Sequence, residues 1–239
     1  MGAKWRLNHE RKTMSKRSKN YKESKEKIES KVYSLEEGLD KTLETAKTKF
    51  DESIELHLRL GIDPSKGDQL VRGTTTLPHG TGKTMKVAAF VPEDKQAEVK
   101  GAGADLVGGE ELIEEISNSK KCDFDIAVAT PDMMRFLGKI ARILGPKGLM
   151  PNPKNETVTP DPAKIIKELK AGKVSFRNDE GANLHQLVGK VSFGKDKLLE
   201  NIEAFVKVVK SAKPTSSKGI YIKNAVLCST MGPSVKIKI

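Results

Sequence analysis

The hydrophobic pattern of the predicted strands changes twice along this chain, and this limits the folds that the chain can adopt. In residues 53–60 apolar and polar side chains alternate, which predicts a strand with one buried face. Residues 86–91 and 124–130 are instead continuous apolar runs, typical of strands in a parallel sheet that is covered on both faces. Alternation returns in residues 173–177 and 186–193. Strands with one buried face are therefore predicted on both sides of a block of strands that are buried on both faces.

The helices predicted between these strands complete the assignment of fold class. Strands and helices alternate in the middle of the chain, which favours an α/β arrangement there. Ser34 and Glu37 form a capping-box pattern that opens a helix ending near Lys47. The other predicted helices are 94–100, 110–118, 132–144, 162–171 and 196–212, and the other predicted strands are 71–77, 104–107, 220–229 and 235–239. We therefore predict an α+β domain formed by both termini, with an inserted α/β domain of the parallel-sheet, Rossmann-like type.

The domain boundaries follow from these patterns. Residues 1–31 are rich in Lys, Ser, Asn and Glu and poor in apolar side chains, which predicts a flexible basic arm, either unstructured throughout or helical from Tyr21 onward when bound. Residues 32–78 plus 173–239 would form the discontinuous α+β domain, and 79–172 the inserted α/β domain. The chain crosses between the domains twice, which permits hinge motion. The predicted hinge residues are His79, Gly80, Ala171 and Gly172.

The charge of the chain is uneven along its length. The formal net charge is +11, yet residues 79–172 contain 14 basic and 14 acidic side chains. Residues 1–31 and 173–239 each carry a net charge of +7, and 32–78 carry −3. If the chain ends meet in space, the domain that they form is basic, and it would attract a polyphosphate partner. Aromatic residues are only 5% of the chain, which favours recognition of RNA shape and backbone over serial base stacking.

Several classes of protein are disfavoured by composition. We expect no membrane span and no secretory signal, because the sequence contains neither a long apolar run nor an apolar segment near its start. Two cysteines without a CxxC motif argue against a disulfide scaffold and a cysteine-based zinc site, and fit a reducing compartment. No two histidines have the spacing of metal ligands, and no nucleophile motif occurs. We therefore expect no catalytic residue, no metal and no cofactor.

The alternative hypothesis is an α/β enzyme that binds a phosphate ligand. Residues 80–84 (Gly-Thr-Gly-Lys-Thr) resemble the end of a phosphate-binding loop, but Leu77 occupies the position of the first glycine, and a strand is predicted to follow instead of a helix. Asp123 and Asp125 flank a strand start, where solvated carboxylates are common. The neutral charge of the inserted domain also disfavours the enzyme hypothesis.

Two loops remain candidates for contact with RNA. Residues 144–154 hold three prolines, two glycines and two lysines, so they form a stiff segment that displays Lys147 and Lys154. This segment is either a structural strap over the inserted domain or a secondary contact with an RNA backbone. Residues 229–234 form a compact turn between two strands, either a simple hairpin turn or a surface that packs against a bent RNA backbone.

Nine short motifs are distributed over most of the chain. They are Lys49-Phe-Asp-Glu-Ser-Ile-Glu55, Leu60-Gly-Ile-Asp-Pro64, Val71-Arg-Gly-Thr74, Leu77-Pro-His-Gly-Thr-Gly-Lys83, Gly103-Ala-Asp105, Val107-Gly-Gly109, Ala129-Thr-Pro-Asp-Met133, Ile143 to Lys154 and Ser229-Thr-Met-Gly-Pro233. Together these motifs resemble the bacterial form of the ribosomal protein L1 family. The resemblance runs from about Ser34 to Ile239 and does not include the N-terminal arm. Glu156 stands where the family usually has a glycine before the Thr-Val-Thr stretch.

The resemblance implies a two-domain, non-enzymatic protein of the large ribosomal subunit in the cytoplasm, monomeric outside the ribosome. It implies binding to the stalk region of large-subunit rRNA, assistance in releasing deacylated tRNA from the exit site, and repression of translation through its own operon mRNA. The RNA-binding residues that it implies are Phe50, Ser53, Glu55, Ser175, Arg177, Asp179, Thr230, Met231 and Gly232.

Overall fold

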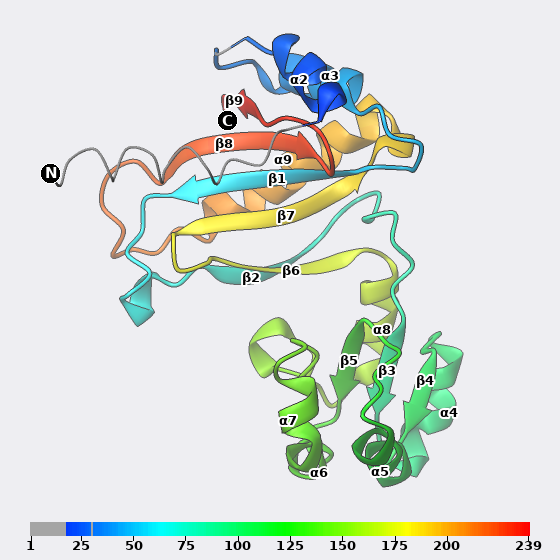
Figure 1. The fold of residues 1–239 in the computed structure, drawn as a ribbon. Helices are drawn as coiled ribbons and strands as arrows, with labels where there is room; N and C mark the ends of the chain where they lie inside the picture. Colours follow the sequence, from blue (N-terminus) through cyan, green and yellow to red (C-terminus); the bar gives the residue numbers. More distant parts are fainter. Residues whose placement is uncertain (1–17, 30) are drawn as a thin grey trace, which may run out of the picture.

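The computed structural model describes residues 18–29 and 31–239. It is a mixed α/β structure with three sheets (Figure 1). A four-stranded antiparallel sheet has the order β7-β1-β8-β9, a two-stranded antiparallel sheet pairs β2 with β6, and a three-stranded parallel sheet has the order β4-β3-β5. The strands are β1 Ser53–Leu60, β2 Arg72–Thr76, β3 Val87–Phe90, β4 Leu106–Gly108, β5 Ile126–Ala129, β6 Lys173–Arg177, β7 Asn183–Lys190, β8 Ile222–Ser229 and β9 Val235–Ile237.

The antiparallel sheets join the two ends of the chain. Strand β1 pairs with β7 on one side and with β8 on the other, and β2 pairs with β6. We call residues 32–78 and 173–239 the terminal region, and residues 79–172 the central region. Helices α3 (Leu35–Thr45) and α9 (Lys195–Ser211) contact the same four-stranded sheet, and Figure 1 shows α9 running behind it.

One face of the four-stranded sheet is buried and the other is not. Alternate residues of β1 are buried, as the sequence predicts, and Leu56 and Leu58 are almost fully covered. They share one hydrophobic cluster with Leu39 of α3 and Phe205 of α9. Burial of such side chains contributes about 1.5–3 kcal/mol each, so α3 and α9 are held to this face mainly by apolar packing. The opposite face of the sheet, which we call the open face, carries the β1 side chains Ser53, Glu55, His57 and Arg59.

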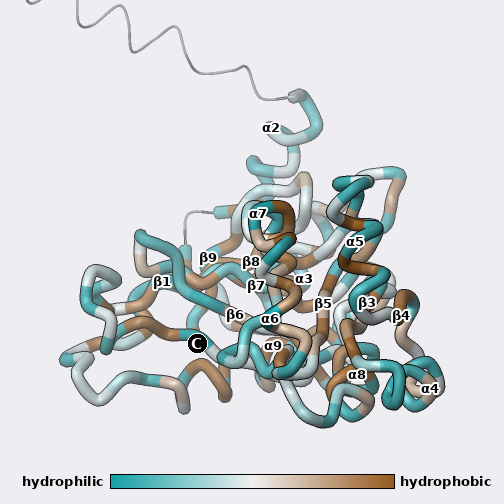
Figure 2. The backbone as a smooth tube through the Cα atoms, turned by 90° about the horizontal axis from the view of Figure 1, so that it is seen from below, coloured by the Kyte–Doolittle hydropathy of each residue, from teal (hydrophilic) through white to brown (hydrophobic). Residues whose placement is uncertain are grey.

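The parallel sheet of the central region is covered on both faces. All four residues of β3 are buried. Val87 and Ala89 belong to a cluster with α4 (Glu93–Gly101) and α8 (Pro162–Lys170), whereas Ala88 and Phe90 belong to a cluster with α5 (Glu110–Ser119). In Figure 2, hydrophilic and hydrophobic residues alternate along α5, as expected for a helix with one buried side. The continuous apolar pattern of this segment therefore reflects helices packed on both faces.

Most predicted elements are present, and two differ from prediction. The helix expected over 132–144 is divided into α6 (Met134–Leu137), a 3₁₀ turn (Gly138–Ile140) and α7 (Ala141–Leu144), because glycine is a weak helix former at this point. The strand expected over 186–193 is β7, which lies three residues earlier. Val191–Phe193 leave the ladder as a 3₁₀ turn, and the N–H of Val191 donates to the carbonyl of Glu52 instead.

Part of the N-terminal segment is helical in the structure. Residues 1–17 of the predicted flexible arm lie outside the described residues, but Lys19–Glu26 form helix α2, capped by the side chain of Ser18. Ser24 is buried, and the Lys27 ammonium lies 3.2 Å from the Glu44 carboxylate of α3. This part of the arm is therefore a helix held against the terminal region. The capping box of Ser34 and Glu37 is confirmed at the start of α3. Among the helices described, none has the length and apolar character needed to cross a membrane.

Candidate nucleic-acid interface

The loop after β8 is fixed to the start of β1. The N–H of Ser53 donates to the hydroxyl of Thr230 at 3.0 Å, and the N–H of Thr230 donates to the carbonyl of Ser53 at 3.1 Å. A Cβ atom on Gly232 would lie 2.3 Å from the Ser229 hydroxyl oxygen, so any larger residue there would displace the Ser229 side chain. The loop is therefore pre-shaped, and it displays Met231, which is 64% exposed. Phe50, in the segment before β1, is 55% exposed.

Glu52 is a buried anchor beneath this surface that the sequence analysis missed. Its side chain accepts hydrogen bonds from the N–H of Thr48 at 3.2 Å and of Met231 at 3.1 Å, and the residue is only 2% exposed. Burial would raise the pKa of Glu52, but the hydrogen bonds to the carboxylate outweigh it, so the pKa is lowered. The ionised carboxylate therefore joins two loops that are far apart in sequence. The signal available was an acidic residue on the buried side of the alternation that continues into β1.

Seven of the nine predicted RNA-binding residues lie on or beside the four-stranded sheet. Phe50, Ser53, Thr230, Met231 and Gly232 gather where β1 begins and β8 ends, and Glu55 follows on the open face of β1. Asp179 lies near the other end of β1, in the turn before β7. Its carboxylate accepts from the N–H of Asn183 at 2.6 Å, and this hydrogen bond is the main reason why the pKa of Asp179 is lowered.

Ser175 and Arg177 lie on a different sheet from the other predicted residues. Both are exposed on β6, where they face Thr74 and Arg72 of β2 across the ladder. Strand β6 also contacts β7, so the two-stranded sheet borders the four-stranded one. The structure thus brings six predicted residues together where β1 begins and β8 ends. The other three, Ser175, Arg177 and Asp179, lie at the margins of the open face.

The open face also contains a cluster of side chains that sequence spacing did not indicate. The Nε2 atom of His57 lies 2.9 Å from the sulfur of Cys228 and 3.7 Å from a carboxylate oxygen of Glu55. Its Nδ1 atom lies 2.8 Å from Nδ1 of His185. Burial, followed by the charge of His185, lowers the pKa of His57. Sequence spacing did not indicate this cluster, because strand pairing joins residues that are distant in sequence.

The proline-rich segment packs on the central region and leaves both of its lysines exposed. Leu144, Leu149 and Met150 pack with the hydrophobic cluster that contains Phe90, as a structural strap would. Lys147 and Lys154 are exposed, and the 3₁₀ turn Pro153–Asn155 contacts β2. The segment therefore covers the central region and also reaches the terminal region.

The two predicted crossings are packed against each other. Gly80 and Gly172 have φ angles of +65° and +104°, and a Cβ atom on Gly172 would lie 2.4 Å from the Cα of Gly80. The N–H of Leu77 donates to the carbonyl of Gly172 at 3.2 Å. Ala171 directly follows α8, and the His79 ring lies 2.6 Å from the carboxylate of Glu200 on α9. The two segments that connect the regions are thus in direct contact at Gly80 and Gly172.

Asn201, a fully buried residue of α9, hydrogen-bonds the first crossing to the terminal region. Its carbonyl oxygen accepts from the N–H of His79 at 3.1 Å, and its amide donates to the carbonyls of Gly80 at 3.0 Å and Val188 at 2.8 Å. No motif in the sequence marked Asn201 as a functional residue. The signal available was a single amide at an otherwise apolar helix position, since Leu198, Ile202 and Phe205 surround it.

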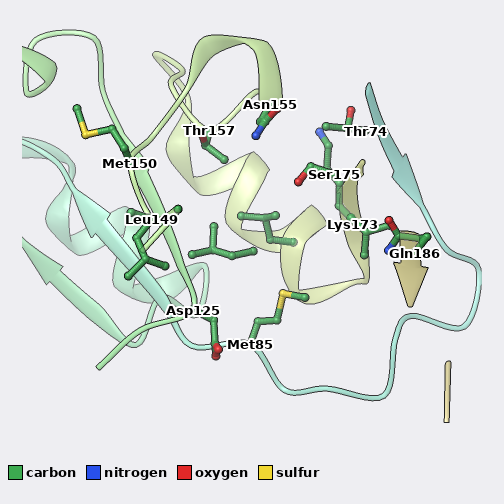
Figure 3. Close-up of a pocket in the computed structure, with 15 residues that line it drawn as sticks. Thr74, Met85, Asp125, Leu149, Met150, Asn155, Thr157, Lys173, Ser175 and Gln186 are labelled. Carbon is green, nitrogen blue, oxygen red and sulfur yellow. The ribbon is translucent and has the colours of Figure 1, made fainter. Parts of the chain in front are cut away.

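A pocket of about 230 Å³ lies between the two regions (Figure 3). Lys173 lines it and is only 8% exposed, and its ammonium pairs with the carboxylates of Glu156 and Glu168, the latter at 2.9 Å. Burial would lower the pKa of Lys173, but hydrogen bonds to these two carboxylates reverse the effect, so the pKa is raised. Lys173 begins β6, whereas Glu156 and Glu168 belong to the central region, so this cluster connects the two.

The loop that resembles part of a phosphate-binding motif does not have the required structure. Residues 80–84 are followed by strand β3, so no helix N-terminus points at the loop. The Lys83 ammonium is held by Asp125 at 2.6 Å, and the same aspartate accepts from the N–H of Lys86 at 3.1 Å. Asp125 therefore lies directly before the start of β5, where its carboxylate pairs with Lys83, and the phosphate-ligand enzyme hypothesis has no support from this loop.

The chain is similar to known ribosomal proteins. Residues 42–233 match the model of the ribosomal protein L1p/L10e family. Large ribosomal subunit protein uL1 of Corynebacterium glutamicum strain R is 52% identical over 225 residues, which cover 94% of this chain and 95% of that protein. The uL1 protein of Solibacter usitatus is 50% identical over 222 residues, 93% of this chain and 94% of that protein.

These alignments extend the expected resemblance. They span more residues than lie between Ser34 and Ile239, so similarity includes part of the N-terminal segment that we expected it to exclude. The relatives are structural proteins of the large ribosomal subunit, which lies in the cytoplasm, and they are not enzymes. The chain therefore belongs to the ribosomal protein L1p/L10e family, and it is a structural protein of the large ribosomal subunit.

Proposed function

We propose that this protein binds the stalk region of large-subunit rRNA through the open face of the terminal region. The RNA-binding residues would be Phe50, Ser53, Glu55, Ser175, Arg177, Asp179, Thr230, Met231 and Gly232, with Lys147 and Lys154 as a secondary contact. The single observation that carries this proposal is the pre-shaped loop at Thr230, fixed through Ser53 and Glu52 while Met231 remains 64% exposed. A rigid surface with hydroxyl and apolar groups suits a folded RNA backbone and its 2′-hydroxyls.

A substitution at Thr230 tests this proposal. Thr230→Val removes the hydroxyl and loosens the hydrogen bonds to Ser53, and we expect binding of a stalk rRNA fragment to weaken by about 1–3 kcal/mol at fixed salt. Thr84→Val is the matched control, because Thr84 is an exposed threonine of the central region. An unchanged dissociation constant for Thr230→Val, with an unchanged melting temperature, would remove this loop from the interface.

We further propose that the terminal and central regions are two domains, and that their relative motion assists release of deacylated tRNA from the exit site. Supporting observations are the separate hydrophobic clusters of the two regions and the narrow double crossing at Gly80 and Gly172. The crossings at His79–Gly80 and Ala171–Gly172 would act as the hinge, with Asn201 anchoring one side. A domain joined by two strands can swing while the other remains bound to rRNA.

Chemical cross-linking tests the motion. In a chain whose two native cysteines are replaced by serine, Thr74→Cys and Glu156→Cys place thiols where the two side chains are now 3.5 Å apart. A short bifunctional thiol reagent should lock the regions together. We expect rRNA affinity to be retained and release of exit-site tRNA to slow, with the untreated double variant as control. Unchanged tRNA release in the locked protein would contradict the proposal.

We also propose that the same surface binds the protein's own operon mRNA and represses its translation, and that the protein is monomeric outside the ribosome. One pre-shaped surface would serve two RNAs that share a fold. An operon leader RNA should then compete with the stalk rRNA fragment, and Thr230→Val should weaken both complexes in parallel. Simultaneous binding of the two RNAs would contradict a shared site.

A further inference from the structure

Three metal-ligating side chains of different chemistry meet on the open face of the four-stranded sheet. Glu55 of β1 lies directly opposite Cys228 of β8 in the ladder, and His57 follows Glu55 by two residues on the same face. Their donor atoms lie within 4.8 Å of one another. Each residue is partly exposed, so an ion can reach the cluster from solvent without opening the core.

A second layer of side chains orients His57 toward this cluster. His57 and His185 are opposite each other on β1 and β7, and their Nδ1 atoms are 2.8 Å apart. Nε2 of His185 lies 3.5 Å from the carboxylate of Asp179. The contact at Nδ1 leaves Nε2 of His57 facing Cys228 and Glu55. A ligating histidine whose other ring nitrogen is held by a second group is the usual support of a protein metal site.

The donor set selects the class of ion. One imidazole nitrogen, one sulfur and one carboxylate oxygen suit Zn²⁺, whereas Mg²⁺ and Ca²⁺ prefer oxygen alone. Zinc bonds of about 2.0–2.3 Å in a tetrahedron place neighbouring nitrogen and sulfur ligands roughly 3.5 Å apart. The 2.9 Å separation of His57 Nε2 and Cys228 Sγ therefore needs to open by a small side-chain movement.

The protonation of the cysteine is compatible with metal binding. Burial and then the charge of Glu55 raise the pKa of Cys228 in the metal-free protein, so the sulfur is a thiol at neutral pH. A bound zinc ion displaces this proton, which leaves to solvent as the sulfur–metal bond forms. The same ion neutralises the Glu55 charge that opposes thiolate formation.

We propose that Glu55, His57 and Cys228 form a Zn²⁺-binding site, with His185 and Asp179 as positioning residues and the fourth coordination position open to solvent. The site does not depend on the proposed RNA interface, although Glu55 and Asp179 belong to both. With three protein ligands, a water molecule would complete the tetrahedral coordination of the ion.

Cobalt substitution tests this site in the full-length protein. After treatment with a chelator, Co²⁺ titration should produce a near-ultraviolet thiolate-to-cobalt charge-transfer band that saturates at one equivalent and disappears when Zn²⁺ is added. Cys228→Ser should abolish the band. Cys122→Ser, which changes the other cysteine in the central region, should leave it intact.

The positioning residues give a graded second measurement. His185→Asn should keep the charge-transfer band but weaken Co²⁺ affinity by about tenfold, the lower end of the range for a lost outer-shell partner. An absent band in the native protein, a band that survives Cys228→Ser, or a band lost in Cys122→Ser would each overturn the proposal. Circular dichroism of each variant confirms that the sheet is retained.

Discussion

The main sheets of the terminal and central regions differ in how many of their faces are covered by helices. The four-stranded sheet has helices on one face only, whereas the parallel sheet is covered on both. As a result, every second side chain of β1 remains accessible to a partner, whereas all four residues of β3 are buried in the core. The difference shows why the four-stranded sheet is a better candidate for a binding surface than the parallel sheet: of these two sheets, it alone has a face that helices do not cover.

The two regions also differ in how they depend on the rest of the chain. The terminal region is assembled from segments more than 100 residues apart, since β1 pairs with β7 and β8. The central region is built from consecutive strands and helices. The comparison therefore predicts two units with separate stability, and the following substitutions are designed to separate them.

The largest effect is expected from truncating a core aromatic in each region. Phe205→Ala in the terminal region and Phe90→Ala in the central region each remove a fully buried ring, which should lower the free energy of unfolding by about 3–5 kcal/mol. Each variant should destabilise its own region and leave the other nearly unchanged. Hydrogen exchange measured by mass spectrometry across a urea series reports the two regions separately.

A single transition that both substitutions shift equally would show that the regions unfold as one unit. The two variants serve as controls for each other, because both remove the same ring from a fully buried position. The proposed pair of domains would then be incorrect, even though their hydrophobic clusters are distinct.

A smaller effect is expected where the regions are joined. Gly172→Ala places a Cβ atom 2.4 Å from the Cα of Gly80 at a φ of +104°, so we expect a loss of about 2–3 kcal/mol in the free energy of unfolding. Gly67→Ala is the control, because a Cβ atom there meets no neighbour within 4 Å. Equal stability of the two variants, measured by urea denaturation, would mean that the crossing can relax at little cost.

The sequence predicted the architecture well because each sheet has its own hydrophobic pattern. Alternation in residues 53–60 identified a half-covered strand, and the continuous run at 86–91 identified a strand covered on both faces. The end of β7 was misplaced because Val191 and Phe193 continue the apolar alternation after their backbone has left the ladder. The local hydrophobic pattern predicts which side chains are buried, but it does not show which backbone groups are hydrogen-bonded in the sheet.

The groups that support the candidate site were harder to predict. Glu52 and Asn201 act through buried hydrogen bonds to backbone groups of distant segments, and a polar residue in a sequence does not identify such partners. The cluster of Glu55, His57 and Cys228 depends on the register between β1 and β8. Sequence spacing reveals ligands on one helix or loop, but not donors on paired strands that lie 171 residues apart.

A moderate effect is expected at the anchor of the Thr230 loop. Glu52→Gln replaces a charged acceptor of two backbone N–H groups by an amide, and should cost about 1–2 kcal/mol of stability at pH 7. The pKa of Glu52 is lowered from 4.5 in the folded chain. Its contribution to stability is therefore complete above about pH 4.5 and is lost as the pH falls through the folded pKa.

Urea denaturation from pH 7 to pH 3 measures this dependence. The native protein should lose stability below about pH 4.5 more steeply than Glu52→Gln. Glu180→Gln, which changes an exposed glutamate of the same region, should follow the native curve. Parallel curves for all three proteins would show that Glu52 is not the buried anchor of this loop.

The smallest effect is expected at Glu156, which connects the two regions. Its backbone has a left-handed φ of +58°, where glycine would be relaxed, while its carboxylate pairs with Lys173 and accepts from the Thr74 hydroxyl at 3.5 Å. Glu156→Gly should release about 1 kcal/mol of backbone strain and lose a similar amount in side-chain contacts, so stability should change by less than about 1 kcal/mol.

Glu156→Ala separates these two contributions, because alanine loses the side-chain contacts but keeps the strained backbone. We expect it to be about 1 kcal/mol less stable than Glu156→Gly in urea denaturation. Lys173 keeps its second partner, Glu168 at 2.9 Å, in both variants, so neither leaves a buried charge unpaired. If the glycine and alanine variants are equally stable, the left-handed backbone at Glu156 carries no cost, and the side-chain contacts between the regions alone account for the choice of glutamate here.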